Sequence, residues 1–128
     1  MIERGEARAA PNDQQTVLIV DDEPAIVDLL AQFLEDEGYR VESASDGEMA
    51  LARVRELHPA LVIADVMMPK MNGFELVDEL SDGQVDVPVI LMSAAVVSRR
   101  DDVAFIAKPF DLGELLDLVT SHLGREAS

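Results

Sequence analysis

Residues 61–73 read Leu61-Val62-Ile63-Ala64-Asp65-Val66-Met67-Met68-Pro69-Lys70-Met71-Asn72-Gly73. Four apolar residues lead directly into a single carboxylate, Asp65, and Asn72-Gly73 then opens the next helix. A continuous apolar run of this length is typical of a β-strand that is covered on both faces. Asp65 is therefore expected at the carboxyl end of a buried strand, the edge at which open α/β sheets bind ligands.

Segments of strand length alternate with segments of helical period along the rest of the chain. Further strands are predicted at residues 16–20, 39–44, 87–92 and 103–107, and helices are predicted to start at Pro24, Ser45, Asn72 and Asp111. This order predicts an α/β fold, with a parallel sheet, right-handed crossovers and helices on both faces. The flavodoxin-like doubly wound strand order 2-1-3-4-5 fits best, because it places the alternating segment 39–44 on an edge. One domain is expected at residues 16–123, between flexible tails at residues 1–15 and 124–128.

Local signals mark where the helices begin and which faces they bury. Three capping boxes are predicted, namely Ser45 with Glu48, Asn72 with Glu75, and Asp111 with Glu114. The first helix, which opens at Pro24 and closes at Gly38, is expected to bury one apolar face. That face comprises Ile26, Leu29, Leu30, Phe33 and Leu34.

The connection between the last two strands departs from this pattern. It consists of residues 94–102, whereas a parallel crossover with its helix generally needs at least about 10–12 residues. It also contains Val96-Val97-Ser98, which is a poor helix nucleus. The fourth helix is therefore predicted to be reduced to two turns or fewer, or to be replaced by extended chain.

The composition excludes several classes of protein. Hydrophobic residues make up 48% of the chain, too many for a disordered protein, and no apolar run approaches the roughly 18 residues of a membrane helix. The absence of cysteine excludes disulfides, thiolate metal sites and cysteine nucleophiles. A net charge of −16 argues against binding of nucleic acid or an anionic membrane by this domain alone. We expect a cytoplasmic protein.

The predicted strand order brings polar side chains from four strand ends to one edge of the sheet. These side chains are Asp21 and Asp22, Asp65, Ser93, and Lys108. Carboxylates packed together repel one another, and a hard cation such as Mg²⁺, which prefers oxygen ligands, resolves that repulsion. Asp22, Asp65 and the Met67 carbonyl are the predicted ligands, while Asp21 is expected to hold a bound water or to orient Lys108. Positive charge on both sides would allow Asp65 to attack a phosphoryl group, and Ser93 could donate a hydrogen bond to it.

With these residues the chain resembles the response regulator receiver domains, the CheY-like family, over about residues 15–123. The matching motifs are Asp21-Asp22, Asp65 with Met67-Met68-Pro69 and Asn72-Gly73, Ser93-Ala94, and Lys108-Pro109-Phe110. The resemblance implies that Asp65 accepts phosphate from the phosphohistidine of a histidine kinase, with Mg²⁺ required. It also implies that Ser93 is a switch hydroxyl, that Lys108 pairs with the phosphate, and that Phe105 changes rotamer on activation. A cis peptide bond is expected before Pro109, because Lys108 must turn back over the sheet edge.

The resemblance also implies partners. These are a histidine kinase or a histidine phosphotransfer protein, and an output protein whose identity is unknown. We expect a signalling domain that phosphorylates itself, not a metabolic enzyme, and a monomer or weak homodimer. Met67 and Ala95 stand two residues past Asp65 and Ser93, and neither side chain can orient a hydrolytic water, which predicts slow self-dephosphorylation.

Other functions explain the same residues less well. A flavin protein of this fold needs a Ser/Thr/Gly-rich phosphate loop after the first strand, whereas Asp21-Asp22-Glu23-Pro24 would repel phosphate. Haloacid-dehalogenase phosphatases carry their nucleophile after the first strand, whereas Asp65 follows the third. One alternative stays open: a receiver-like protein-interaction module that is never phosphorylated. The altered connection at residues 94–102 supports this alternative.

Overall fold

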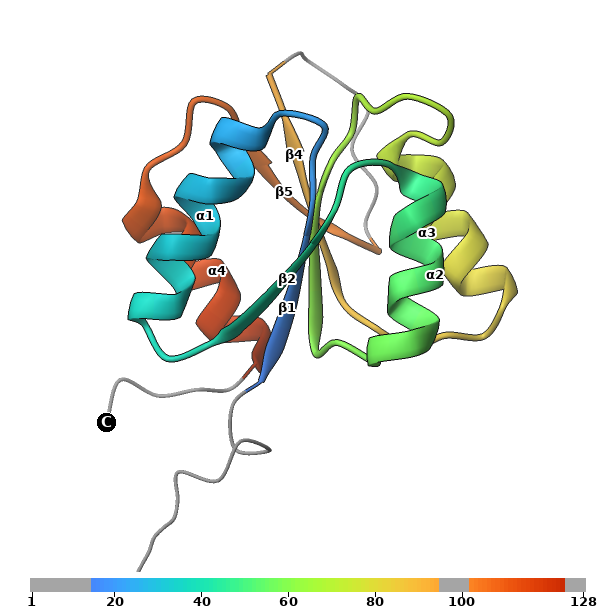
Figure 1. Ribbon diagram of the computed structural model, residues 1–128, viewed down its shortest axis with the longest axis horizontal. Helices are drawn as coiled ribbons and strands as arrows, with labels where there is room; N and C mark the ends of the chain where they lie inside the picture. The colour runs from blue at the N-terminus through green and yellow to red at the C-terminus, as the bar shows by residue number, and fades with distance from the viewer. Residues whose placement is uncertain (1–14, 95–101, 124–128) are drawn as a thin grey trace, which may run out of the picture.

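The computed structural model describes residues 15–94 and 102–123, which contain a five-stranded sheet (Figure 1). The strands are β1 (Thr16–Val20), β2 (Arg40–Ala44), β3 (Leu61–Asp65), β4 (Val89–Ser93) and β5 (Ala104–Ala107). All neighbouring strands pair in parallel, in the order β2-β1-β3-β4-β5. The predicted flavodoxin-like fold is therefore confirmed, and β2 lies on an edge as its alternating sequence indicated.

Most of the predicted tails and of the unusual connection lies outside the described residues. Of the tails only Gln15 is described, and of residues 94–102 only Ala94 and Asp102 are described. The prediction that the helix between β4 and β5 is shortened or replaced by extended chain therefore stays a prediction; it does not concern the helix labelled α4.

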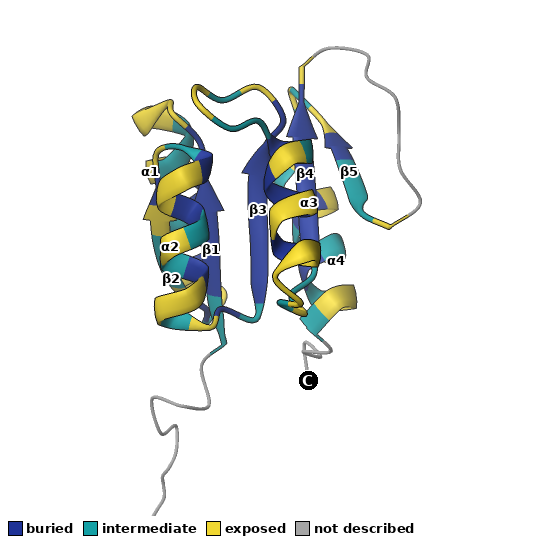
Figure 2. Ribbon diagram, turned by 90° about the vertical axis from the view of Figure 1, so that its right-hand side faces the viewer, coloured by how far each residue is buried: buried dark blue, intermediate teal, exposed yellow. Residues whose placement is uncertain are grey.

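Helices cover both faces of the sheet. Helices α1 (Pro24–Asp36) and α4 (Leu112–Leu123) lie on one face, and α2 (Gly47–Leu57) and α3 (Gly73–Asp82) lie on the other (Figure 1). Successive side chains of a strand point to opposite faces. Leu61 and Ile63 accordingly pack with α1 and α4, whereas Val62 and Ala64 pack with α2 and α3. All of β3 is buried (Figure 2), which explains its unbroken apolar sequence.

None of the described helices combines the length and the apolar character that crossing a membrane requires.

The inner face of α1 differs from the prediction at one position. Leu29 is 49% exposed, whereas Leu30 and Leu34 are fully buried. Val27 packs in the same cluster as Leu30. The buried stripe is centred on Leu30 and Leu34, and Val27 lies one turn before Leu30, so it completes the stripe in place of Leu29.

Four element starts also differ from the prediction: β2 begins at Arg40 and β5 at Ala104, each one residue later than expected, and α2 and β4 differ as follows. Helix α2 has Asp46 as its N-cap, whose Oδ1 accepts from the Met49 N–H at 2.8 Å, so the box of Ser45 with Glu48 was wrong. Asp and Ser cap helices about equally well, so two adjacent candidates could not be separated by spacing alone. Strand β4 begins at Val89 and not at residue 87, since Pro88 has no N–H to donate to the sheet.

The other two predicted caps are supported by the structure. Asn72 and Glu75 form the predicted capping box, with bonds of 2.8 and 2.9 Å. At α4, Asp111 accepts from the Glu114 N–H at 3.1 Å.

Gly73, the first residue of α3, fixes this helix against the end of β3. A Cβ added at Gly73 would lie 2.8 Å from Leu91 Cδ2, 2.9 Å from the Asp65 carbonyl oxygen and 3.0 Å from Val66 Cα. Two of these contacts are with backbone atoms, which cannot move aside cheaply. Glycine therefore sets how closely α3 approaches the strand that ends in Asp65.

We expect Gly73→Ala to lower the free energy of unfolding by about 1–3 kcal/mol, because the added methyl group overpacks a buried backbone contact. Urea denaturation at equilibrium measures the change. Gly83→Ala is the matched control at the other end of α3, since its Cβ would come no closer than 3.4 Å to Glu79 O and its φ is −82°. Equal losses in the two variants would contradict the explanation.

Candidate functional site

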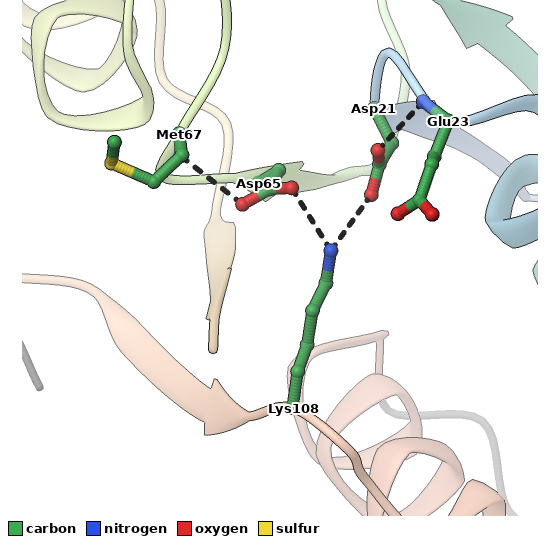
Figure 3. Close-up of polar contacts among 5 residues, drawn as sticks. All are labelled: Asp21, Glu23, Asp65, Met67 and Lys108. Atoms are coloured by element: carbon green, nitrogen blue, oxygen red, sulfur yellow. Dashed lines mark hydrogen bonds and ion pairs between the residues drawn. The ribbon is translucent and has the colours of Figure 1, made fainter. Parts of the chain in front are cut away.

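The carboxyl ends of three strands bring charged side chains together. Asp65 is the last residue of β3, Asp21 follows β1, and Lys108 follows β5. The Lys108 Nζ donates to Asp65 Oδ2 at 2.9 Å and to Asp21 Oδ2 at 3.1 Å (Figure 3). Because β4 stands between β3 and β5, the Lys108 side chain reaches across the end of β4 to bridge the two carboxylates.

The two neighbouring aspartates differ in how they are held. Asp21 is 2% exposed; its Oδ1 accepts from the Glu23 N–H at 2.9 Å, and its own N–H donates to Ala44 O at 3.1 Å. Asp22 is exposed to solvent. The structure thus ties Asp21 to Lys108 and leaves the Asp22 carboxylate accessible.

Burial and charge oppose each other at these groups. Burial lowers the pKa of the Lys108 ammonium, but the hydrogen bonds and charges of Asp65 and Asp21 outweigh it and raise this pKa above 10.5. Burial raises the pKa of the Asp21 carboxyl above 3.8, and hydrogen bonds from Glu23 and Lys108 offset only part of the rise. The folded chain thus binds the Asp21 proton more tightly than the unfolded chain. Asp21 therefore favours folding at low pH, and this contribution is lost as the pH rises through its folded pKa.

The carboxylates have the composition and spacing of a site for a hard cation. One oxygen from each of Asp21, Asp22 and Asp65 lies within 4.8 Å of the others. Oxygen donors suit Mg²⁺, which usually keeps several water ligands, and the exposed side of Asp22 leaves room for them. A single Lys108 does not balance three carboxylates, so a divalent cation fits the charge as well as the donor type.

The loop that follows β3 holds Asp65 from the side opposite Lys108. The Met67 N–H donates to Asp65 Oδ1 at 3.1 Å (Figure 3). The Val66 N–H donates to Met92 O at 2.8 Å, and the Gly73 N–H donates to Val66 O at 2.9 Å, which anchors both ends of the loop. The Met67 side chain is 67% exposed, so this position is open to solvent.

The remaining predicted site residues lie farther along the sheet. Ser93 is the last residue of β4 and is buried. It directly follows Met92, which pairs with Asp65 in the sheet. The Ser93 carbonyl accepts from the Lys108 N–H at 2.9 Å. Phe105 of β5 is half-buried on the α2 and α3 face and lies outside the charged cluster. The predicted cis peptide bond between Lys108 and Pro109 is confirmed.

Two contacts near the site were not predicted from the sequence. Phe105 packs against Phe74 of α3, with ring centroids 5.8 Å apart. The Lys70 Nζ lies 3.8 Å from Asp46 Oδ2, which joins the loop after β3 to the start of α2. Asp46-Gly47 can be recognised in the sequence as a possible helix start. Its capping chemistry does not indicate which other segment of the chain will pack against that helix start.

Comparison with known sequences identifies similar proteins over most of the chain. A sequence model of the response regulator receiver domain matches residues 17–120. The chain is 40% identical over 121 residues to "Response regulator GtcR" of Aneurinibacillus migulanus, covering 87% of this chain and 48% of that protein. It is 35% identical over 121 residues to "DNA-binding response regulator MtrA" of Mycolicibacterium smegmatis, covering 88% and 52%. The chain thus spans about half the length of these relatives.

Solved structures agree with the sequence matches. The response regulator protein TrrA from Thermotoga maritima, in complex with Mg²⁺-BeF, superposes with a TM-score of 0.79 at 33% identity, covering 85% of this chain and 99% of that one. A CheY-like response regulator receiver domain protein from Methanospirillum hungatei gives a TM-score of 0.81 at 29% identity, covering 87% and 94%.

We expect Lys108→Met to lower the free energy of unfolding by about 2 kcal/mol at pH 7 without metal, because two carboxylates lose their cationic partner. The pKa of Lys108 is raised by folding, so its contribution is complete below the ordinary value of 10.5 and is lost as the pH rises through the folded pKa. Urea denaturation in EDTA should be repeated at increasing pH up to strongly alkaline values. The difference in the free energy of unfolding between wild type and Lys108→Met should decrease as the pH rises.

Lys70→Met is the matched control for this prediction. The Lys70 side chain is 61% exposed and lies 3.8 Å from its partner, so its loss should change stability by no more than about 0.5 kcal/mol. An equal loss in both variants, or a gap for Lys108→Met that does not depend on pH, would contradict the assignment.

Proposed function

The chain belongs to the response regulator receiver domains of two-component systems, and we propose that it acts as a Mg²⁺-dependent phosphoacceptor with Asp65 as the acceptor. The observation that carries the proposal is the Lys108 bridge at the end of β3. It supplies a fixed cation 2.9 Å from Asp65 Oδ2, beside two further carboxylates. This arrangement suits a carboxylate that must receive an anionic group.

The proposed reaction is a phosphoryl transfer between two nucleophiles. A carboxylate reacts slowly with a phosphoryl group because both carry negative charge, and positive charge placed in advance lowers this barrier. One Asp65 oxygen forms a bond to phosphorus while the phosphorus–nitrogen bond of a donor phosphohistidine breaks, and the imidazole nitrogen keeps the electron pair. Lys108 then pairs with the negative charge that the product adds at this edge.

The metal would be held by the chain's oxygen atoms. We assign Asp22, Asp65 and the Met67 carbonyl as its ligands, with Asp21 acting through a bound water or through Lys108. When bound, Mg²⁺ supplies positive charge to the incoming phosphoryl oxygens. The spacing of the three carboxylates and the Mg²⁺-BeF complex of the related Thermotoga protein support this assignment.

Two further residues are proposed to report phosphorylation to a partner. Ser93, buried at the end of β4, would donate a hydrogen bond from its hydroxyl group to a phosphoryl oxygen. Phe105 would change rotamer in response, and its contact with Phe74 would then connect β5 to α3. Both roles are those that the resemblance to receiver domains implied.

The proposed donor is a histidine kinase or a histidine phosphotransfer protein. A relative named as a DNA-binding response regulator is about twice as long as the region matched here, so regulation of an output partner is the corresponding role for this chain. Nothing in the net charge of −16 favours direct binding of nucleic acid by this domain.

We expect wild-type protein to gain one phosphoryl group from acetyl phosphate only when Mg²⁺ is present. Asp65→Asn should abolish this gain, because the amide cannot act as the nucleophile. Mass spectrometry of the intact chain measures the modification.

Asp86→Asn is the control for this experiment, since Asp86 is exposed and precedes β4 at the opposite end of the sheet. Undiminished labelling of Asp65→Asn would refute Asp65 as the acceptor. A wild type that takes no phosphate from acetyl phosphate or from a phosphorylated histidine protein would favour the non-phosphorylated interaction module.

We expect saturating Mg²⁺ to raise the melting temperature, because the ion binds the folded carboxylate cluster and not the unfolded chain. At 100 times the dissociation constant the shift should be on the order of 8 °C. Asp22→Asn should lose more than half of the shift, whereas Asp36→Asn at the far end of α1 should keep it. Equal shifts in the two variants would mean that the ion does not bind at Asp22.

A further inference from the structure

The first turn of α2 packs directly on the loop that carries Met67. A Cβ added at Gly47 would lie 2.7 Å from Met71 Cβ and 2.7 Å from the Met71 carbonyl oxygen. Gly47 is buried, and its φ is not in the left-handed region. Glycine is therefore needed at this position for close approach and not for backbone conformation.

The part of the loop that touches Gly47 is conformationally strained. Lys70 has a φ of 70°, and the Met71 N–H donates to Pro69 O at 2.7 Å, which closes a three-residue turn. Such turns are rare for residues other than glycine and persist where the surroundings impose them. The start of α2 forms these surroundings, because Gly47 packs directly on Met71, the residue that follows Lys70.

Hydrogen bonds to Asp65 and Val66 hold the same loop on the side of the site. The Gly73 N–H bonds Val66 O at 2.9 Å, and the Met67 N–H bonds Asp65 Oδ1 at 3.1 Å. Gly73 lies against the Asp65 and Val66 backbone, so α3 resists a displacement that begins at Met71. We therefore expect the segment from Met67 to Lys70, which orients Asp65 and supplies the proposed Met67 ligand, to take up most of such a displacement.

We propose that Gly47 is a positioning residue for Asp65, which acts by seating the loop from Met67 to Met71 without contacting the site itself. This inference rests on the proposed function. It adds a determinant of metal affinity in a helix on the other side of the loop. The absence of a side chain at residue 47 is what allows the Met67 N–H to reach Asp65.

Gly47→Ala tests the proposal, with Gly83→Ala as the matched control. The Mg²⁺ concentration for half-saturation, followed by NMR titration of the full chain, should rise about tenfold in Gly47→Ala, as is usual when a residue supporting a metal ligand is changed. The Met67 amide resonance should already shift before metal is added. A residue that only stabilises the fold would change neither quantity in the folded protein, and Gly83→Ala should leave both unchanged.

A double-mutant cycle with Met71→Gly completes the test. Met71→Gly removes the Cβ and Cγ contacts of the new methyl group but leaves the Met71 carbonyl oxygen 2.7 Å away, so Gly47→Ala should raise the half-saturation concentration less, but still measurably, in this background. If Gly47→Ala alone does not fold, the double variant is compared with Met71→Gly alone, and the half-saturation concentration should still rise. Equal effects of Gly47→Ala in both backgrounds, or a Met67 resonance that matches wild type, would overturn the proposal. If wild type itself binds no Mg²⁺, the proposed function fails, while the Met67 resonance still tests the seating of the loop.

Discussion

The Lys108 ammonium lies between Asp65 and Asp21, and the strand order is what makes this contact possible. Asp21, Asp65 and Lys108 are far apart in the chain, yet each comes directly at the end of a strand in one parallel sheet. All strands point the same way, so their carboxyl ends share one edge. The strand order places β1 and β4 on either side of β3, so Lys108 reaches Asp65 across the end of β4 and contacts Asp21 beyond it.

The charges at this edge explain why the site should need a further ion. With all groups ionised, three carboxylates and one ammonium leave a formal charge of −2. Asp21 is buried and its pKa is raised, so the fold pays for keeping it ionised. A divalent cation brings the total to zero, and the proposed phosphoryl group adds negative charge only when that cation is in place. The charge imbalance of the metal-free cluster would thus make the proposed phosphorylation depend on metal.

The sequence was most informative where one physical rule acts alone. The apolar run before Asp65 predicted a strand buried on both faces, and the alternation of strands with helices predicted a parallel sheet. The alternating segment 39–44 then favoured the strand order that places it on an edge. It was less informative where two features compete: Val27 takes the place of Leu29 in the core, and Asp46 caps α2 in place of Ser45. The contact of Gly47 with Met71 could not be predicted, because it depends on how closely two segments approach and not on either segment's own preferences.

The site combines groups that are fixed with groups that are open to solvent. Asp21 and Asp65 are buried at strand ends and bonded to Lys108, so their positions are set by the sheet. Asp22 and Met67 are exposed and belong to the loops that follow those strands. The proposed phosphoryl donor would enter from the open side, while the proposed acceptor, Asp65, is held at the end of its strand. The proposed acceptor lies on a fully buried strand and its exposed neighbours lie on two loops, so the position of the loop after β3 is part of the site's geometry.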